Sequence, residues 1–193
     1  EPMEAQRLQK TINNYNNYLT KKSSAAFANL CDELTIKKGT IVLKTNQYDN
    51  SEYILLKGTA RTFLVNTEGE EITLYFFEDN TIIPPYVTRT ENGKSLLYCE
   101  ALTDCTFAIM DAKQFENLMV ENIEIREFGN TILRQELLNK VQKEIRMASW
   151  TAKQSLDQFR KDFSMLENLV PHPMIASYLG ITNVSLSRLR KQS

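Results

Sequence analysis

The sequence predicts an α+β protein, in which an antiparallel β sandwich or barrel with flanking helices precedes a long helix and a small all-α domain. Three observations lead to this prediction. Turn-forming residues interrupt short β-branched and aromatic runs between residues 34 and 110, at intervals of about 8–12 residues. Uninterrupted helical periodicity follows, and a short basic segment lies near the end. We expect domains at 1–120, 121–148 and 149–193.

The composition is that of a soluble globular chain and excludes several other classes. The 193 residues carry a net charge of −1 and are 42% hydrophobic, which suffices for one sizeable core. No stretch approaches the roughly 20 apolar residues of a membrane span, and the first residues do not resemble a secretory signal. Cys31, Cys99 and Cys105 are interpreted as thiols of a reducing cytoplasm. His172 is the single histidine, so we expect no metal site, no catalytic site and no enzyme.

The N-terminal part is expected to begin with helices and continue as strands. Apolar residues recur at helical spacing over about the first 32 residues; they are Leu8, Ile12, Tyr15 and Leu19, and in a second short helix Phe27, Leu30 and Leu34. Strands are expected at Thr40–Lys44, Tyr53–Lys57, Ala60–Val65, Glu71–Phe77, Ser95–Leu102 and Thr106–Asp111. Asn66-Thr67-Glu68-Gly69 predicts a hairpin loop. A short helix is expected at Lys113–Val120.

The next helix, from Ile123 to about Met147, is long enough to pair with its copy in a homodimer. Its apolar stripe, flanked by charges, consists of Ile125, Phe128, Ile132, Leu138, Val141 and Ile145. Gln135 and Asn139 interrupt the stripe, so the register of a dimer seam is left open. The alternative is a helix that packs only on its own sheet. A hinge is expected at Ala148–Ala152, with Trp150 packed at that junction.

The last part of the chain has the features of a helix-turn-helix. Pro173 suits the first turn of the first helix, Ala176 permits close helix crossing, and Gly180 tolerates the positive φ of the turn. Thr182 or Asn183 can cap the second helix. The expected buried positions are Ile175, Leu179, Ile181, Leu186 and Leu189. The alternative is an ordinary tight helical hairpin, which the same spacing would also describe.

Positive charge is concentrated in this last part, which indicates a nucleic-acid partner. Residues 149–193 contain six basic and three acidic residues, so they carry +3 while residues 1–148 carry −4. The candidates for reading DNA bases are Asn183, Val184 and Arg188, because asparagine suits adenine, valine the thymine methyl group and arginine guanine. The candidates for phosphate contacts are Thr182, Ser185, Ser187, Arg190 and Lys191.

The order of these parts resembles the Crp/Fnr family of bacterial transcription regulators over nearly the whole chain. The best-matched segment is IASYLGITNVSLSRLRK (175–191), and weaker matches are KKGTIVL (37–43) and EYILLKGTARTF (52–63). The resemblance implies a cyclic-nucleotide-binding-like jelly roll, a homodimer, and a recognition helix 183–191 in the major groove of double-stranded DNA, where Arg188 matches the guanine-reading arginine. It also implies a small-molecule effector and RNA polymerase as partners. The family's wing hairpin is not expected, because the chain stops at Ser193.

The resemblance is weakest at the effector pocket. Family members that bind cyclic nucleotides carry Gly-Glu and then Arg-Ser or Arg-Thr, where this chain has Pro84-Pro85-Tyr86 and Lys94-Ser95. Proline lacks an amide donor and lysine lacks the arginine fork, so we expect no cyclic nucleotide in the usual mode and no cofactor. The candidate pocket residues are Tyr86, Arg89, Lys94 and Ser95; the alternative is a solvated loop.

A second hypothesis keeps the fold but not the DNA-reading role. In that case the chain is a ligand-binding or protein-interaction module whose helix-turn-helix no longer reads DNA. Arg188 discriminates between the two hypotheses, because its loss affects sequence preference only in a protein that reads bases.

Overall fold

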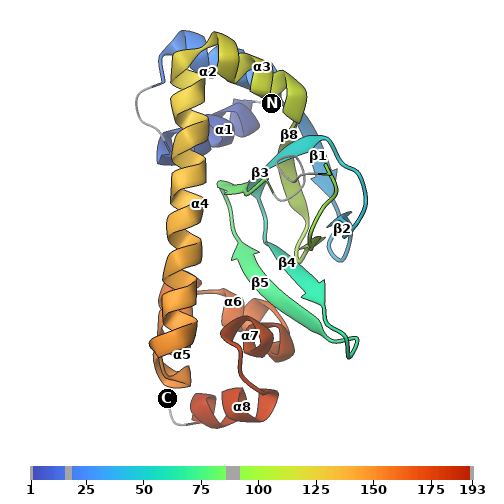
Figure 1. The fold of residues 1–193 in the computed structure, drawn as a ribbon, viewed down its shortest axis with the longest axis vertical. Helices are drawn as coiled ribbons and strands as arrows, with labels where there is room; N and C mark the ends of the chain where they lie inside the picture. Colours follow the sequence, from blue (N-terminus) through green and yellow to red (C-terminus); the bar gives the residue numbers. More distant parts are fainter. Residues whose placement is uncertain (1, 16–18, 86–91, 192–193) are drawn as a thin grey trace. The chain divides into compact units, whose positions relative to one another are not determined.

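The computed structural model describes residues 2–15, 19–85 and 92–191, and Figure 1 shows the order of its helices and strands. The N-terminal elements are α1 (Pro2–Tyr15), α2 (Lys21–Ala28), β1 (Asp32–Ile36), β2 (Ile41–Leu43), β3 (Ser51–Lys57), β4 (Ala60–Val65), β5 (Glu71–Phe77), β6 (Thr81–Ile83), β7 (Tyr98–Ala101) and β8 (Cys105–Asp111). The remaining helices are α3 (Ala112–Glu121), α4 (Ile123–Ser149), α5 (Ala152–Asp162), α6 (Leu166–Leu169), α7 (His172–Leu179) and α8 (Asn183–Lys191). None of the helices in these ranges has both the length and the apolar character of a membrane span.

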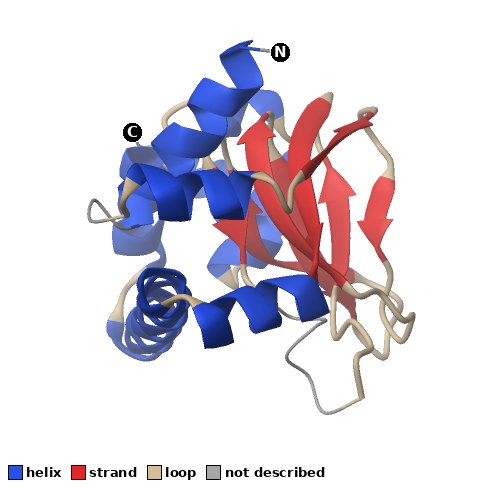
Figure 2. Cartoon of the chain, turned by 90° about the horizontal axis from the view of Figure 1, so that it is seen from above, coloured by secondary structure: helices blue, strands red, loops and turns tan. Residues whose placement is uncertain are grey.

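The strands form two four-stranded sheets, in the orders β1-β8-β3-β6 and β2-β7-β4-β5. Strand pairing in the first sheet is antiparallel, as is the pair of β2 and β7. Figure 2 shows the strands, in red, lying side by side. The hairpin loop between β4 and β5 closes as expected, because the Asn66 N–H donates to the Glu70 carbonyl over 2.9 Å and Gly69 has a φ of 82°. The antiparallel β fold with flanking helices is confirmed.

Gly58 marks a close backbone approach between β3 and β4. Its φ is +106°, and a Cβ atom there would lie 2.7 Å from both the Asp104 carbonyl oxygen and the Cys105 Sγ atom. Only glycine fits this turn without displacing the backbone of its neighbours.

Strands β4 and β5 have the predicted bounds, whereas two other strands were not predicted. The second helix was expected to reach Leu34, but α2 ends at Ala28 and Leu34 lies in β1, opposite Phe107. The β-branched residues Thr35 and Ile36 of the same run favour a strand, and pairing with β8 outweighs the helical spacing. Strand β6 has only three residues and is too short for an alternating pattern to be visible in the sequence.

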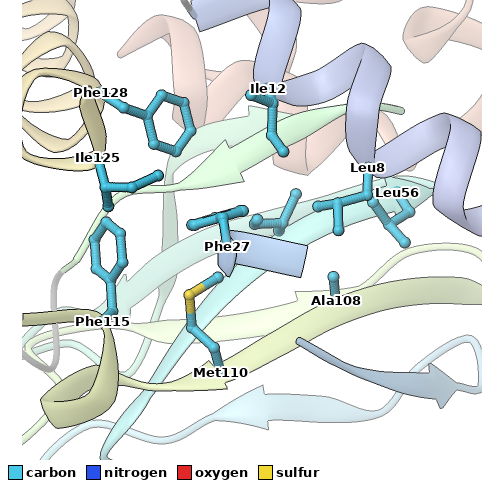
Figure 3. Packing of buried hydrophobic residues seen from close by; sticks show 10 residues of the cluster. Leu8, Ile12, Phe27, Leu56, Ala108, Met110, Phe115, Ile125 and Phe128 are labelled. Carbon is cyan, nitrogen blue, oxygen red and sulfur yellow. The ribbon is translucent and has the colours of Figure 1, made fainter. Parts of the chain in front are cut away.

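The main hydrophobic cluster joins the first four helices to the first sheet. Its buried members are Leu8, Ile12, Phe27, Ile54, Leu56, Ala108, Met110, Phe115, Ile125 and Phe128. Figure 3 shows Phe27 among the side chains of the other helices. Its ring meets the rings of Phe115 and Phe128 edge to face, with centroids 5.7 and 5.3 Å away. Edge-to-face pairs of this kind stabilise a core by more than the burial of their apolar surface alone.

The two ends of the predicted dimer stripe lie on different sides of α4. Ile125 and Phe128 are completely buried in the main cluster, and Ile132 packs against it. These three residues therefore pack on the core of their own chain, on a different side of α4 from the rest of the predicted stripe. Leu138, Val141 and Ile145 are 43–55% exposed. The same exposed side includes Leu133 and Leu137, which the sequence analysis did not select.

The chain divides into two compact units. One comprises Glu1–Arg61 and Phe76–Leu137, and the other comprises Thr62–Tyr75 and Leu138–Ser193. The β4–β5 hairpin therefore groups with the C-terminal helices. Within this second unit, the Thr73 N–H donates to the Ser177 hydroxyl over 3.1 Å, and the Lys143 ammonium lies 4.5 Å from the centre of the Tyr75 ring.

Candidate nucleic-acid interface

Helices α7 and α8 form the predicted helix-turn-helix. Gly180 ends α7 with φ 69° and ψ 30°, a left-handed conformation that glycine adopts without strain. The Ile181 N–H then donates to the Ala176 carbonyl over 3.0 Å, which closes the turn. Thr182 caps α8, because its hydroxyl accepts from the Ser185 N–H over 3.1 Å. The alternative cap, Asn183, is instead the first residue of the helix.

The turn is held by a small core within the same unit. Ile175 and Leu186 are completely buried, and Ala176 at the helix crossing is 2% exposed. The other predicted core positions, Leu179, Ile181 and Leu189, are half-buried. The rings of Phe159, Phe163 and Tyr178 lie against one another with centroids 5.4–6.2 Å apart. This packing presents α8 on a fixed support.

The three candidate base-reading side chains are exposed together on α8. Asn183, Val184 and Arg188 all face solvent, and Val184 is 59% exposed although it is apolar. Arg188 and Lys191 form no ion pair with any described residue. Of the other phosphate candidates, Thr182 and Ser187 are exposed and Ser185 is half-buried. A helix with this exposed polar edge and an unpaired arginine fits the width and the hydrogen-bonding pattern of a DNA major groove.

Arg190 has a different environment from the other cations of α8. Its Nε atom lies 2.8 Å from a Glu167 oxygen, and its guanidinium also contacts the ring of His172. Arg160 binds the same carboxylate through two hydrogen bonds of 2.7 and 2.9 Å. These contacts tie α8 to α5 and α6. The first role of Arg190 is therefore to hold the helix in place, which the sequence analysis did not predict.

Glu167→Gln is expected to lower the free energy of unfolding at pH 7 by about 1.5–3 kcal/mol, since two arginines lose a charged partner. Chiefly the hydrogen bonds from Arg160 hold the pKa of the Glu167 carboxyl below its usual range. A lowered folded-state pKa stabilises the fold fully above the unfolded value of about 4.3, and this contribution is lost as the pH falls through the folded pKa. The difference in unfolding free energy between the wild type and Glu167→Gln should therefore become smaller in acid.

Urea unfolding at pH 7 and in acid, followed by the fluorescence of Trp150, measures this effect. The matched control is Asp157→Asn, because the Asp157–Lys153 pair is exposed and 3.7 Å long. An exposed pair of this kind contributes at most about 0.5 kcal/mol. Equal losses in the two variants would contradict an anchoring role for Glu167.

The candidate effector residues are not brought together in the described part of the structure. Tyr86 and Arg89 lie outside the described residues. Lys94 is exposed and its ammonium lies over the ring of Tyr48, 5.4 Å from the centre. Ser95 is buried, and its hydroxyl donates to the Leu97 carbonyl over 2.6 Å. Neither side chain is oriented as one half of a phosphate clamp.

A buried ion pair occupies the second sheet instead. Arg61 on β4 is 2% exposed, and its guanidinium binds one Glu100 oxygen on β7 over 2.7 and 2.8 Å. The sequence offers no periodic signal for this pair, because the two residues are far apart along the chain. No group of three potential metal-ligating side chains occurs within the described ranges.

The comparisons with known proteins agree with this architecture. Residues 33–122 match the family model of the cyclic nucleotide-binding domain. This segment is therefore similar to a cyclic nucleotide-binding domain. It covers the strands of both sheets and α3, and the long helix α4 begins immediately after it. No curated protein matches the chain.

Several solved structures share the fold over most of the chain. The c-di-GMP-responsive global regulator CLP of Xanthomonas campestris aligns over 90% of this chain and 91% of its own, with 14% identity and a TM-score of 0.72. A protein of Eubacterium rectale assigned to the Crp/Fnr family aligns over 93% and 87%, with 20% identity and a TM-score of 0.70. The catabolite activator protein of Thermus thermophilus aligns over 92% and 85%, with 13% identity and a TM-score of 0.59. The chain thus has the fold of the Crp/Fnr regulators, as the sequence resemblance implied.

Proposed function

We propose that the chain is a sequence-specific, DNA-binding transcription regulator that acts as a homodimer. The observation that carries this proposal is the exposed edge of α8, where Asn183, Val184 and Arg188 project from a firmly supported helix. The regulatory names of the structural neighbours support it. Asn183 and Val184 read the bases beside the guanine that Arg188 binds, and the phosphate contacts come from Thr182, Ser185, Ser187 and Lys191.

The dimer interface in this proposal is the exposed apolar side of α4. It consists of Leu133, Leu137, Leu138, Val141 and Ile145, which are 43–64% exposed. Leu133, Leu137, Val141 and Ile145 follow one another at intervals of four, and Leu138 lies three positions before Val141. Two copies of the helix can therefore bury this side against each other. The two recognition helices then enter successive major grooves about 34 Å apart.

The effector of the regulator is not a cyclic nucleotide bound in the usual mode. The exposed Lys94 over Tyr48, the internally bonded Ser95 and the buried Pro84 support this part of the proposal. A proline offers no amide donor for a cyclic phosphate, and a lysine bound elsewhere offers no bidentate fork.

The proposal is tested by Arg188→Ala after selection of bound fragments from random DNA. The wild type is expected to select a two-fold-symmetric motif with half-sites one helical turn apart. Arg188→Ala should weaken binding to that motif by about 1–3 kcal/mol and relax the preference at one base pair of each half-site. Fluorescence anisotropy with the selected duplex and a scrambled duplex measures both effects.

Two other variants serve as controls. Lys191→Ala should weaken binding to both duplexes equally and reduce the salt dependence by about one unit of slope. Lys153→Ala removes an exposed cation of α5 that pairs with Asp157, and it should change neither. If Arg188→Ala keeps the wild-type affinity and preference, α8 does not read DNA. The chain is then a ligand-binding or protein-interaction module.

A further inference from the structure

A cavity of about 160 Å³ lies within the C-terminal unit, where the end of α4 meets α5 and the turn after α7. All its walls belong to the unit formed by Thr62–Tyr75 and Leu138–Ser193. Its walls include the charged residues Lys143, Arg146 and Asp162. None of the candidate base-reading residues of α8 lines it. The cavity is therefore separate from the proposed DNA-reading surface.

The walls of the cavity carry an excess of positive charge. Asp162 accepts hydrogen bonds from Gln158 over 2.7 Å and from Arg146 over 3.4 Å, so its charge is shared with Arg146. The Lys143 ammonium donates to the Leu74 carbonyl and lies 4.9 Å from the centre of the Tyr178 ring. Its contacts with the described residues include no carboxylate.

Lys143 is also poorly solvated. Burial, together with the charges of Lys140 and Arg146, lowers the pKa of its ammonium to about 8. Lys143 and Arg146 are three positions apart on α4, so both face the same cavity. An anion placed between them would give Lys143 a negatively charged partner, which its contacts with the described residues do not include.

Three of the other residues that line the cavity are aromatic. Trp150, Phe159 and Tyr178 line the cavity, and the Arg146 guanidinium lies 5.9 Å from the Trp150 ring. An apolar cavity of about 150 Å³ accommodates one benzene ring, and this cavity is of similar size and opens to solvent. Its walls therefore combine aromatic side chains with two cations that lie close to them.

We propose that this cavity binds a small single-ring carboxylate, with its carboxylate between Lys143 and Arg146 and its ring against Trp150 and Tyr178. The binding site is independent of the proposed function. Only its effect on DNA affinity would rest on that function, because the ligand would contact α4, α5 and the turn before α8 together.

Trp150 is the single tryptophan of the chain, so its fluorescence reports directly on the cavity. Benzoate is the probe, and benzamide is its uncharged analogue of nearly the same shape. We expect a saturable change of emission with benzoate at constant ionic strength and a binding constant at least tenfold weaker for benzamide. A response without saturation up to tens of millimolar, or equal affinities for the two compounds, would overturn the proposal.

Variants of the two cations test where the carboxylate of benzoate binds. Arg146→Gln and Lys143→Met should each weaken benzoate binding at least tenfold while leaving benzamide binding unchanged. Lys153→Gln, on the exposed side of α5, is the matched control and should bind benzoate like the wild type. Unchanged benzoate affinity in Arg146→Gln would place the anion elsewhere. Lys143 also binds the Leu74 carbonyl, so Lys143→Met is used only if thermal melting shows that it is folded. If it is not folded, the result for Arg146→Gln alone tests the proposal.

Discussion

Phe128→Ala is expected to lower the free energy of unfolding by about 3–5 kcal/mol, the usual cost of emptying a phenylalanine site in a core. Phe128 is completely buried, and its ring meets Phe27 at 85° with a centroid distance of 5.3 Å. Neighbouring side chains from α1, α3 and the first sheet cannot all move in to fill the space, because they also pack against one another. Urea unfolding followed by circular dichroism measures the loss.

The dependence of this loss on protein concentration distinguishes a core residue from a residue of the dimer interface. A residue buried within its own chain stabilises each copy equally at every protein concentration, whereas an interface residue stabilises the dimer by mass action. The loss in Phe128→Ala should therefore be the same at micromolar and at much higher concentrations. Leu137→Ala, on the exposed side of α4, is the control, and its effect should grow with concentration. If the loss of unfolding free energy in Phe128→Ala grows with protein concentration, Phe128 contributes to the dimer interface.

The sequence predicted the type and order of most elements because their signals are local. The hairpin Asn66–Gly69 follows from its turn residues, and Gly180 with Thr182 fixes where α7 ends and α8 begins. The break between α4 and α5 also falls within the predicted hinge, since α4 ends at Ser149 and Thr151 caps α5. Each of these features depends on residues within a few positions of one another.

The two sides of α4 show where a local pattern was misread. The predicted stripe passes from Ile132 to Leu138, a step of six residues that turns an α-helix by about 600°. Leu138 therefore lies about 120° away from the side of the helix that carries Ile132. A helix that changes its buried side in this way contacts its own core first and offers a different side to a partner. The sequence contained this information in its spacing.

Long-range contacts could not be predicted in the same way. The grouping of the hairpin with the C-terminal helices depends on Tyr75 and Lys143, which are far apart along the chain. Likewise, Glu167 looked like one of three acids in a basic segment, yet it binds both Arg160 and Arg190. Charge counts identify a basic surface but not which cations are already paired. The sequence assigned both Arg188 and Arg190 to DNA contacts, whereas in the structure Arg190 binds Glu167 and Arg188 has no carboxylate partner among the described residues.

Val141→Glu is expected to dissociate the proposed dimer. Val141 is 43% exposed in the single chain and lies at the middle of the apolar side of α4, between Leu137 and Ile145. In a symmetric pair of helices each copy would place a carboxylate in the apolar seam, opposite the same change in its partner. Burying like charges at an interface costs several kcal/mol. The dimer dissociation constant should therefore rise on the order of 100-fold, which corresponds to about 3 kcal/mol.

Sedimentation equilibrium over a range of concentrations measures this constant, and circular dichroism verifies that each copy stays helical. Gln142→Glu adds the same charge at the adjacent position, which lies about 100° around the helix and faces solvent. It should leave the dimer intact. Val141→Glu should also lose most of its affinity for a two-fold-symmetric DNA site, because two half-sites are bound tightly only by linked recognition helices. A Val141→Glu protein that remains a dimer would show that the two copies do not meet along this side of α4.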